Sequence, residues 1–216
     1  MRIIAVLATI FATMPAVAAP RSTAVRQANA APQSPMVQLA PIDLTRVPEP
    51  CKSLAKQALA QNLAAALSAR VSLASCMADR AIAPLALCDC GESVLAVDAA
   101  VAPAIALLDN AIEVGDPATQ VIAEHAEGKL YLGFVARLRA TLPGPAAGAD
   151  DAAGRLHDLR KQTLEVQLAP WHEAAMAAFQ HVVDTAKAHP ELASHAAAAA
   201  AIRDSQQQLS AEVAEK

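Results

Sequence analysis

The sequence contains few aromatic and few glycine residues. Aromatic side chains make up 2% of the chain, with a single tryptophan and a single tyrosine, and glycine occurs 7 times in 216 residues. No segment alternates apolar and polar residues between turn signals, as a half-buried strand would. Alanine, in contrast, accounts for roughly a quarter of the chain, and it has the highest intrinsic helix propensity. The composition therefore predicts an all-α protein.

The usual sequence motifs of enzymes and cofactor sites are also absent. The chain has no Gly-x-Ser-x-Gly, no P-loop, no Gly-x-Gly-x-x-Gly and no Cys-x-x-Cys-His for haem attachment. Its net charge of −4 is mild, and no basic patch with interleaved aromatics occurs, which argues against a nucleic-acid partner. We therefore predict no catalytic residue, no cofactor, no metal and no nucleic-acid partner.

The N-terminus has the layout of a secretory signal peptide. Arg2 supplies a positive charge, residues 3–14 form an apolar run, and Ala16-Val17-Ala18 is a small-x-small cleavage site. We predict a signal peptide over residues 1–18, because the apolar run is too short to span about 30 Å of hydrocarbon. The best later membrane candidate, residues 94–108, is also too short. We expect an exported protein, periplasmic or secreted, from a Gram-negative-type bacterium, with no transmembrane segment after cleavage.

Prolines divide the rest of the chain. Residues 19–50 contain six prolines among Ser, Gln and Ala, which predicts a disordered or extended linker. A helical domain is expected over residues 51–212, and the polar tail 213–216 should fray. Helical apolar spacing between breakers predicts helices at about 51–81, 89–114, 117–142, 151–168, 170–188 and 191–212. Because the connections are short, we predict an antiparallel bundle of four to six helices.

Several helix boundaries carry local signals. Asp89 with Glu92 three residues later resembles a capping box. Asp116 followed by Pro117 is the clearest helix start in the chain. Pro170 is expected either to kink the helix before it or to open a new one.

A short solenoid of helical hairpins is the alternative fold. Ala175, Phe179, Val182 and Pro190 resemble the second helix of a tetratricopeptide repeat. The proline comes later than in that repeat, the Trp-x2-Leu-Gly-x2-Tyr signature of the first helix is absent, and no second copy follows. The resemblance therefore covers one hairpin and implies a tetratricopeptide-like hairpin there.

The four cysteines are expected to form disulfides, because the protein should enter an oxidising compartment. They are Cys51, Cys76, Cys88 and Cys90. The Cys-x-Cys spacing of the last two matches neither the Cys-x2-Cys pairs of zinc sites nor the Cys-x-x-Cys of thioredoxin-like centres. Thiol exchange or copper binding by this pair remains an alternative.

The pairing follows from the predicted helices. If residues 51–80 form one helix, Cys51 and Cys76 lie about 37 Å apart along it. A disulfide needs Cα atoms within about 7 Å. We therefore expect Cys76 to pair with Cys90 or Cys88 across a turn, and we leave the partner of Cys51 open, including a pairing between chains.

Two further residues are candidates for binding. His125 lies between Glu124 and Glu127 on the apolar line of its helix, where it could act as a base or ligand, or as a structural histidine. Trp171 could anchor a partner or fill the core. The remaining histidines lack the three- or four-residue spacing that places two metal ligands on one helix face.

Three functions are compatible with the sequence. The leading hypothesis is an exported, non-enzymatic helical protein that acts through protein–protein contacts, as an adaptor, envelope scaffold or chaperone-like binder. The second is a ligand- or metal-binding bundle that uses Cys88, Cys90 or His125. The third is an enzyme of unrecognised class. The sequence contains no signal for the oligomeric state.

Overall fold

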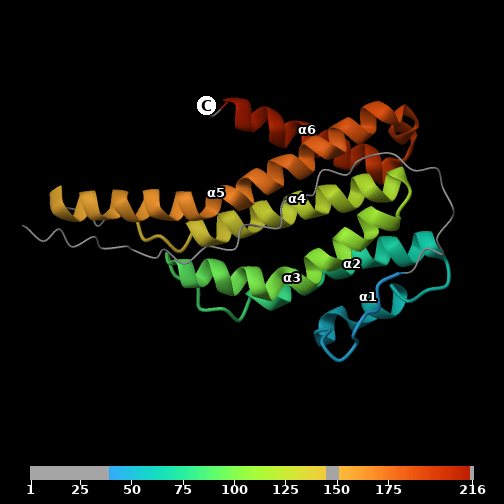
Figure 1. Ribbon diagram of the computed structural model, residues 1–216, viewed down its shortest axis with the longest axis horizontal. Helices are drawn as coiled ribbons and strands as arrows, with labels where there is room; N and C mark the ends of the chain where they lie inside the picture. The colour runs from blue at the N-terminus through green and yellow to red at the C-terminus, as the bar shows by residue number, and fades with distance from the viewer. Residues whose placement is uncertain (1–38, 145–150, 215–216) are drawn as a thin grey trace, which may run out of the picture.

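The computed structural model describes residues 39–144 and 151–214, which form helices joined by short connections (Figure 1). This part of the chain contains six α-helices, two 3₁₀-helices and no strand. In chain order the elements are η1 (Glu49–Cys51), α1 (Lys52–Gln57), α2 (Leu63–Ile82), α3 (Gly91–Val114), α4 (Pro117–Arg139), α5 (Asp151–Ala188), η2 (Pro190–Ser194) and α6 (Ala196–Ala214).

The helices pack as an antiparallel bundle. Neighbours in sequence are neighbours in space: α2 packs on α3, α3 on α4 and α4 on α5, while α6 returns along α4 and α5 (Figure 1). This is the arrangement that short connections favour. The prediction of an all-α helical bundle is confirmed.

One large apolar core lies between α2, α3, α4 and α5. It includes Leu67, Leu73, Val97, Val101, Leu108, Val135, Leu138, Leu164, Leu168 and Trp171. A second, smaller cluster holds α6 in place, and it consists of Val121, Val182, Leu192, Ala198 and Ala201. The alanine tract of α6 therefore packs closely against α4 and α5, because its short side chains let the helix backbone approach.

The contact between α4 and α5 depends on one glycine. A Cβ atom added at Gly128 would lie 2.6 Å from the Phe179 ring, well inside the van der Waals distance. Phe179 is fully buried. Gly128 therefore sets how closely α4 can approach α5.

The first predicted helix, residues 51–81, is broken in the structure. The chain leaves α1 at Ala58, turns through residues 59–61 and starts α2 with Asn62 as the N-cap. The Asn62 side chain accepts a hydrogen bond from the backbone N–H of Ala65 at 3.0 Å. Asparagine is among the most favoured N-cap residues, so this was the local signal for the break.

The other two predicted helix starts differ in outcome. Asp116 caps α4 as predicted, since its carboxylate accepts a hydrogen bond from the Thr119 N–H at 2.8 Å and Pro117 takes the first position. The start of α3 was predicted at Asp89, but the N-cap is Cys90 and no side chain caps the helix there.

Pro170 lies inside α5, which is one helix of 38 residues rather than two. A proline removes the hydrogen bond to the carbonyl four residues earlier, here that of Val166. Val166 is 70% exposed, so water can reach that side of the helix. Figure 1 shows that α5 changes direction along its length, as a proline in a helix favours.

The expected boundary between linker and helical domain, at residue 51, lies too late in the chain. Val47 is only 4% exposed, and Leu39 and Ile42 pack on the core. Both backbone groups of Ala40 are hydrogen-bonded to the helices: its N–H donates to Asn110 Oδ1, and its carbonyl accepts from Arg70 Nη2. Residues 39–50 are therefore docked on the helices, and they turn at residues 44–47 and enter η1 at Glu49 rather than forming a disordered or extended linker.

The predicted signal peptide, residues 1–18, and the linker up to residue 38 lie outside the described residues. At the other end α6 continues to Ala214, slightly past the predicted end of the domain.

In the described part of the chain, α3 is long and apolar enough to cross a membrane by length and composition. Core helices often meet the same criterion. Val97, Val101 and Leu108 of α3 are almost fully buried in the shared core, and 39% of the apolar window is buried in all.

Candidate functional site

The disulfide between Cys51 and Cys76 corrects the expected pairing. Their Cα atoms lie 5.9 Å apart, and the two sulfurs are bonded. The expectation that Cys76 pairs with Cys88 or Cys90 is wrong, because it assumed one straight helix from residue 51 to residue 80. The break after α1 brings Cys51 back onto the side of α2, where it is fully buried.

Cys88 and Cys90 are bonded to each other in the loop between α2 and α3. Their Cα atoms lie 5.3 Å apart, with one residue between them. Cys88 is exposed and Cys90 half-buried. No described cysteine is free. Two disulfides are typical of a protein that matures in an oxidising compartment outside the cytoplasm.

The Ser93 hydroxyl lies beside both sulfurs of this loop. Its oxygen accepts a hydrogen bond from the Cys88 N–H at 2.7 Å, and it lies 3.2 Å from Cys88 Sγ and 3.7 Å from Cys90 Sγ. Because a disulfide sulfur carries no hydrogen, the hydroxyl is the only group that can donate in the two contacts with sulfur. Ser93 itself is only 4% exposed.

His125 connects α4 to α6. Its Nε2 lies 2.7 Å from Asp204 Oδ2, and Lys129 Nζ lies 3.4 Å from the same oxygen. The hydrogen bond from His125, followed by the Lys129 charge, lowers the pKa of Asp204 below its ordinary value. The other side of the His125 ring faces Phe179, with ring centroids 6.0 Å apart. His125 thus joins α4 to α6 through Asp204 and packs on Phe179 of α5.

A groove of about 340 Å³ runs beside His125 between α2 and α4. Its basic side chains are Lys129 and Arg137, and its floor includes Phe134. Each basic group faces a carboxylate, since Lys129 contacts Asp204 and Arg137 donates to Asp79 at 2.6 Å. The groove is therefore lined by ion pairs that join helices, and its positive charges are neutralised.

Trp171 fills the core. It is 4% exposed, and its ring meets Phe134 at 5.3 Å and Tyr131 at 6.3 Å between centroids, both edge to face. Edge-to-face packing is a favoured arrangement of aromatic rings. A side chain buried in this way does not project to a partner.

Glu127 titrates unusually. Burial, and then the negative charge of Asp109 on α3, raise the pKa of Glu127 from the ordinary 4.5 to about 7, although a hydrogen bond with Tyr131 opposes the change. Burial and the charge of Glu127 also raise the pKa of Tyr131. Within residues 39–144 and 151–214, no group of three or more His, Cys, Asp or Glu side chains is arranged to hold a metal ion.

The first half of α5 projects beyond the bundle and carries an apolar surface that we call the α5 stripe (Figure 1). The stripe consists of Leu156, Leu159 and Val166, which are 52%, 61% and 70% exposed. At 100° per residue these side chains fall within an arc of about 80°. Leu164 and Leu168, which are buried in the core, point in a nearly opposite direction.

Sequence reasoning missed the α5 stripe because it assigned this helix its bounds without comparing the spacing of its apolar residues. The available signal was spacing: Leu156, Leu159 and Val166 follow the a and d positions of a heptad, whereas Leu164 and Leu168 do not belong to that series. An interpretation with two separate stripes predicts a helix that packs on both sides.

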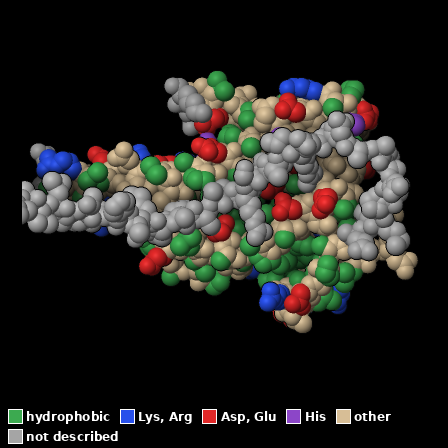
Figure 2. All heavy atoms as spheres, in the orientation of Figure 1, with side chains coloured by type: hydrophobic (Ala, Val, Ile, Leu, Met, Phe, Trp, Pro, Cys, Tyr) green, Lys and Arg blue, Asp and Glu red, His purple; other side chains and the backbone are tan. Residues whose placement is uncertain are grey.

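Basic residues border the α5 stripe. On the helix surface Arg155 lies at one edge of the stripe and Arg160 at the other, and both are exposed. Figure 2 shows basic and apolar side chains together on the projecting end of α5. The surface therefore combines apolar contact area with positive charge at its margins.

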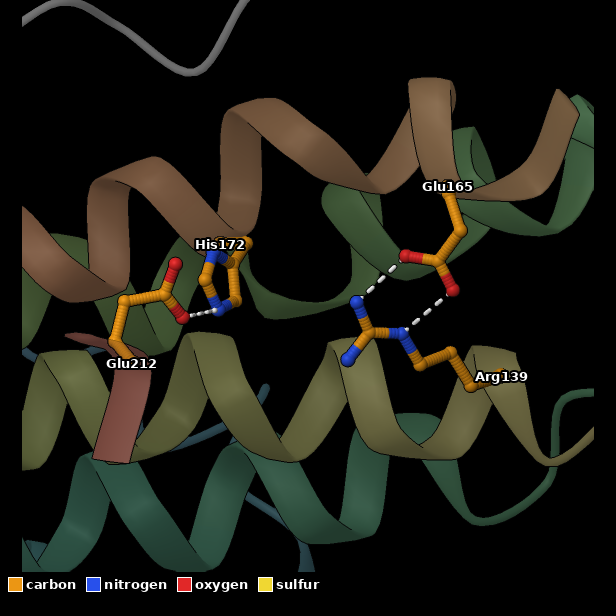
Figure 3. Close-up of polar contacts among 4 residues, drawn as sticks. All are labelled: Arg139, Glu165, His172 and Glu212. Carbon is orange, nitrogen blue, oxygen red and sulfur yellow. Dashed lines mark hydrogen bonds and ion pairs between the residues drawn. The ribbon is translucent and has the colours of Figure 1, made fainter. Parts of the chain in front are cut away.

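Ion pairs hold the opposite side of α5 on the bundle (Figure 3). Arg139 of α4 donates to both carboxylate oxygens of Glu165, at 2.9 Å and 2.6 Å. His172 Nε2 lies 3.2 Å from Glu212 Oε2 of α6. These contacts fix the rotation of α5 and keep the α5 stripe directed away from the core.

No protein-family model, curated protein sequence or solved structure matches this chain.

Proposed function

We propose that this is an exported protein, periplasmic or secreted, that binds another protein through the α5 stripe. The observation that carries the proposal is the exposure of Leu156, Leu159 and Val166 on one face of a helix that projects from the bundle. Large apolar side chains grouped on an exposed face are typical of interaction sites. The two disulfides support the proposed compartment.

The partner we propose is an amphipathic helix whose apolar side chains are bordered by Asp or Glu. Heptad spacing in the α5 stripe suits packing against another helix, in the helix-in-groove or coiled-coil manner. Arg155 and Arg160 would face the acidic residues of such a helix and contribute to specificity. A second copy of this chain fits less well, because its own arginines would approach these two.

Site-specific photo-crosslinking in cells that export the full-length chain tests the proposal. A photoreactive side chain at Leu159 or Val166 should capture one discrete protein, whereas the same group at Lys161, on another side of the projecting helix, should not. Leu156→Asp should abolish capture from Val166, and circular dichroism should show unchanged helix content.

The other outcomes are equally specific. If only a second copy of the chain is captured, the α5 stripe is a dimer interface and not a site for another protein. If only lipid is captured, the α5 stripe binds a membrane surface. Equal capture from all three positions, or no adduct at any of them, would contradict the proposed role of the α5 stripe.

A further inference from the structure

We propose that Cys88 and Cys90 form a thiol–disulfide exchange site that accepts two electrons from a dithiol of another protein. The exchange chemistry does not depend on the α5 stripe, and only the assignment of the dithiol to a protein rests on the proposed function of that stripe. The exchange chemistry depends on the position of the disulfide in the loop between α2 and α3, on its surroundings and on its difference from the Cys51–Cys76 disulfide.

Access is the first requirement. Exchange begins when a thiolate attacks a disulfide sulfur, so that sulfur must be reachable from solvent. Cys88 is exposed and Cys90 half-buried. Cys51 is fully buried and Cys76 is half-buried, so neither cysteine of the other disulfide is as exposed as Cys88. The two disulfides of one chain thus differ in the property on which attack depends.

The second requirement is a stabilised leaving thiolate. Cys90 is the N-cap residue of α3, a helix of 24 residues, and no side chain caps that helix. The N-terminus of a helix carries partial positive charge, and thiols at this position have lowered pKa values. Once released from Cys88, the Cys90 thiolate would occupy the position of the missing cap.

Ser93 supplies a hydrogen-bond donor. Its hydroxyl lies 3.2 Å from Cys88 Sγ and 3.7 Å from Cys90 Sγ, and its oxygen is held by the Cys88 N–H. Because the oxygen accepts from the backbone, the hydroxyl hydrogen is available to a sulfur. We assign Ser93 as a positioning residue that stabilises sulfur when negative charge develops on it.

The step proceeds in two attacks. A thiolate of the incoming dithiol attacks the exposed Cys88 sulfur, a mixed disulfide forms, the Cys88–Cys90 bond breaks, and its electron pair goes to Cys90 Sγ as thiolate. The second thiol of the dithiol loses its proton to solvent. It then attacks the dithiol's own sulfur in the mixed disulfide, and the intramolecular disulfide of the dithiol forms. Cys88 leaves as thiolate, and both released cysteines take up protons according to their pKa values. The dithiol is oxidised by two electrons, and the Cys88–Cys90 disulfide is reduced by two.

Two nearby acidic residues oppose thiolate formation at Cys88 and Cys90. Asp89 lies between the cysteines and Glu92 lies in the first turn of α3. A negative charge disfavours a neighbouring thiolate, although water screens an exposed carboxylate such as that of Glu92. Asp89→Asn should therefore accelerate exchange, which is a directional test of the same electrostatics.

The site also lies beside α5. A Cβ atom at Gly91, next to Cys90, would lie 3.3 Å from Gln167 Nε2. Gln167 directly follows Val166 of the α5 stripe. A protein bound to that stripe would be close to the disulfide, which suits a protein dithiol as substrate.

The experiment measures reduction of each disulfide in the native, full-length exported chain by a small dithiol, dithiothreitol. Differential alkylation and mass spectrometry follow the two pairs separately. We expect Cys88–Cys90 to be reduced at least about tenfold faster than Cys51–Cys76. Equal rates, or reduction of both only on unfolding, would overturn the proposal.

A second measurement separates chemistry from structure. In the reduced loop, thiolate absorbance should give a Cys90 thiol pKa below the ordinary value of about 8.5. Ser93→Ala should raise that pKa and slow reduction about tenfold, with helix content unchanged. Ser72→Ala, which removes an exposed hydroxyl on α2, is the matched control and should change neither. A Cys90 pKa at or above the ordinary value would contradict the assigned role of the α3 N-terminus.

Because the reductant is a small molecule, this assay does not require the α5 stripe. Fast reduction together with failed photo-crosslinking would retain the exchange site and reject the docking surface. Equal reduction rates together with successful photo-crosslinking would reject the exchange site and retain the docking surface.

Discussion

The Cys51–Cys76 and Cys88–Cys90 disulfides differ in their effect on the fold. The first joins residues 25 apart and fixes the segment before α2 to the side of that helix. The second joins residues two apart in an exposed loop. The entropy removed from the unfolded chain grows with the length of the closed loop, so the first has the larger structural effect.

The surroundings of the two disulfides differ in the same way. Around the first, Cys51 and Ala55 are fully buried and belong to the large apolar core. Around the second, the contacts are those of a serine hydroxyl and the start of α3. One disulfide therefore belongs to the packed interior, and the other lies where reactants can reach it. The predictions below test this difference, from the largest expected effect to the smallest.

Removing the buried disulfide should have the largest effect. The chain-entropy model gives the Cys51–Cys76 loop about 3.5 kcal/mol. The double change Cys51→Ala with Cys76→Ala should lower the melting temperature by about 10 °C, measured by circular dichroism. A change within about 2 °C would mean that the packing around Val47 and Ala55 is sufficient to hold this region.

Replacing Arg70 should have the second-largest effect on stability. Its guanidinium donates to Asn110 Oδ1 at 3.1 Å and to the Ala40 carbonyl at 2.7 Å, inside the core. Hydrogen bonds that involve a charged group contribute about 1.5–3 kcal/mol, so Arg70→Ala should destabilise the fold by about 2.5 kcal/mol. Chemical denaturation measures this loss, and limited proteolysis should now cut within residues 39–47.

Arg80→Ala is the control for that experiment, because Arg80 is an exposed arginine at the end of the same helix. It should leave both stability and proteolysis unchanged. Resistance of residues 39–47 in the Arg70 variant would mean that the apolar contacts of this segment dominate.

The stability of the fold and the reduction of the exposed disulfide should depend on pH in opposite directions. The pKa of Glu127 is raised from 4.5 to about 7, so the folded state keeps a proton that the unfolded chain has lost. The associated stability is present below pH 4.5 and is lost as pH rises through about 7. The change should be on the order of 3 kcal/mol, and thermal melts across this window measure it.

Glu127→Gln should flatten this profile, whereas Glu113→Gln, an exposed carboxylate on α3, should not. Reduction of Cys88–Cys90 by a thiol should show the opposite trend, rising with pH as the attacking thiolate forms. A stability profile that Glu127→Gln leaves unchanged would contradict the proposed titration of Glu127.

Removing the exposed disulfide should have the smallest effect on stability. Cys88→Ala with Cys90→Ala opens a loop of only a few residues, for which the chain-entropy model gives a loss of stability of about 1 kcal/mol. The melting temperature should fall by no more than about 4 °C, while reactivity toward dithiothreitol at this loop is lost. A loss as large as that of the Cys51–Cys76 variant would show that the loop disulfide is structural.

Local interactions explain the parts of the fold that sequence reasoning predicted. Helix propensity and the Asp116–Pro117 start act within a few residues, so they were readable directly. The break at Asn62 was equally local, but the apolar residues on both sides of it continued the helical spacing and concealed it. That single boundary error led to the wrong partner for Cys76.

The candidate sites were less predictable. His125 was expected either as a base or ligand or as a structural residue, and its partner Asp204, 79 positions away, could not be inferred from sequence. Ser93 was not recognised at all, because its importance depends on how the Cys88–Cys90 loop folds over the start of α3.

The sequence by itself determined that the chain is helical, that α4 begins at Asp116 and that the molecule has four cysteines suited to oxidation. Only the tertiary structure decided which cysteines pair, that Trp171 lies inside while Leu159 and Val166 lie outside, and that residues 39–50 belong to the domain. The physical reason is range: capping and helix propensity operate over about one helical turn. Burial and disulfide pairing depend on residues that are distant in the chain and become neighbours only when the helices pack.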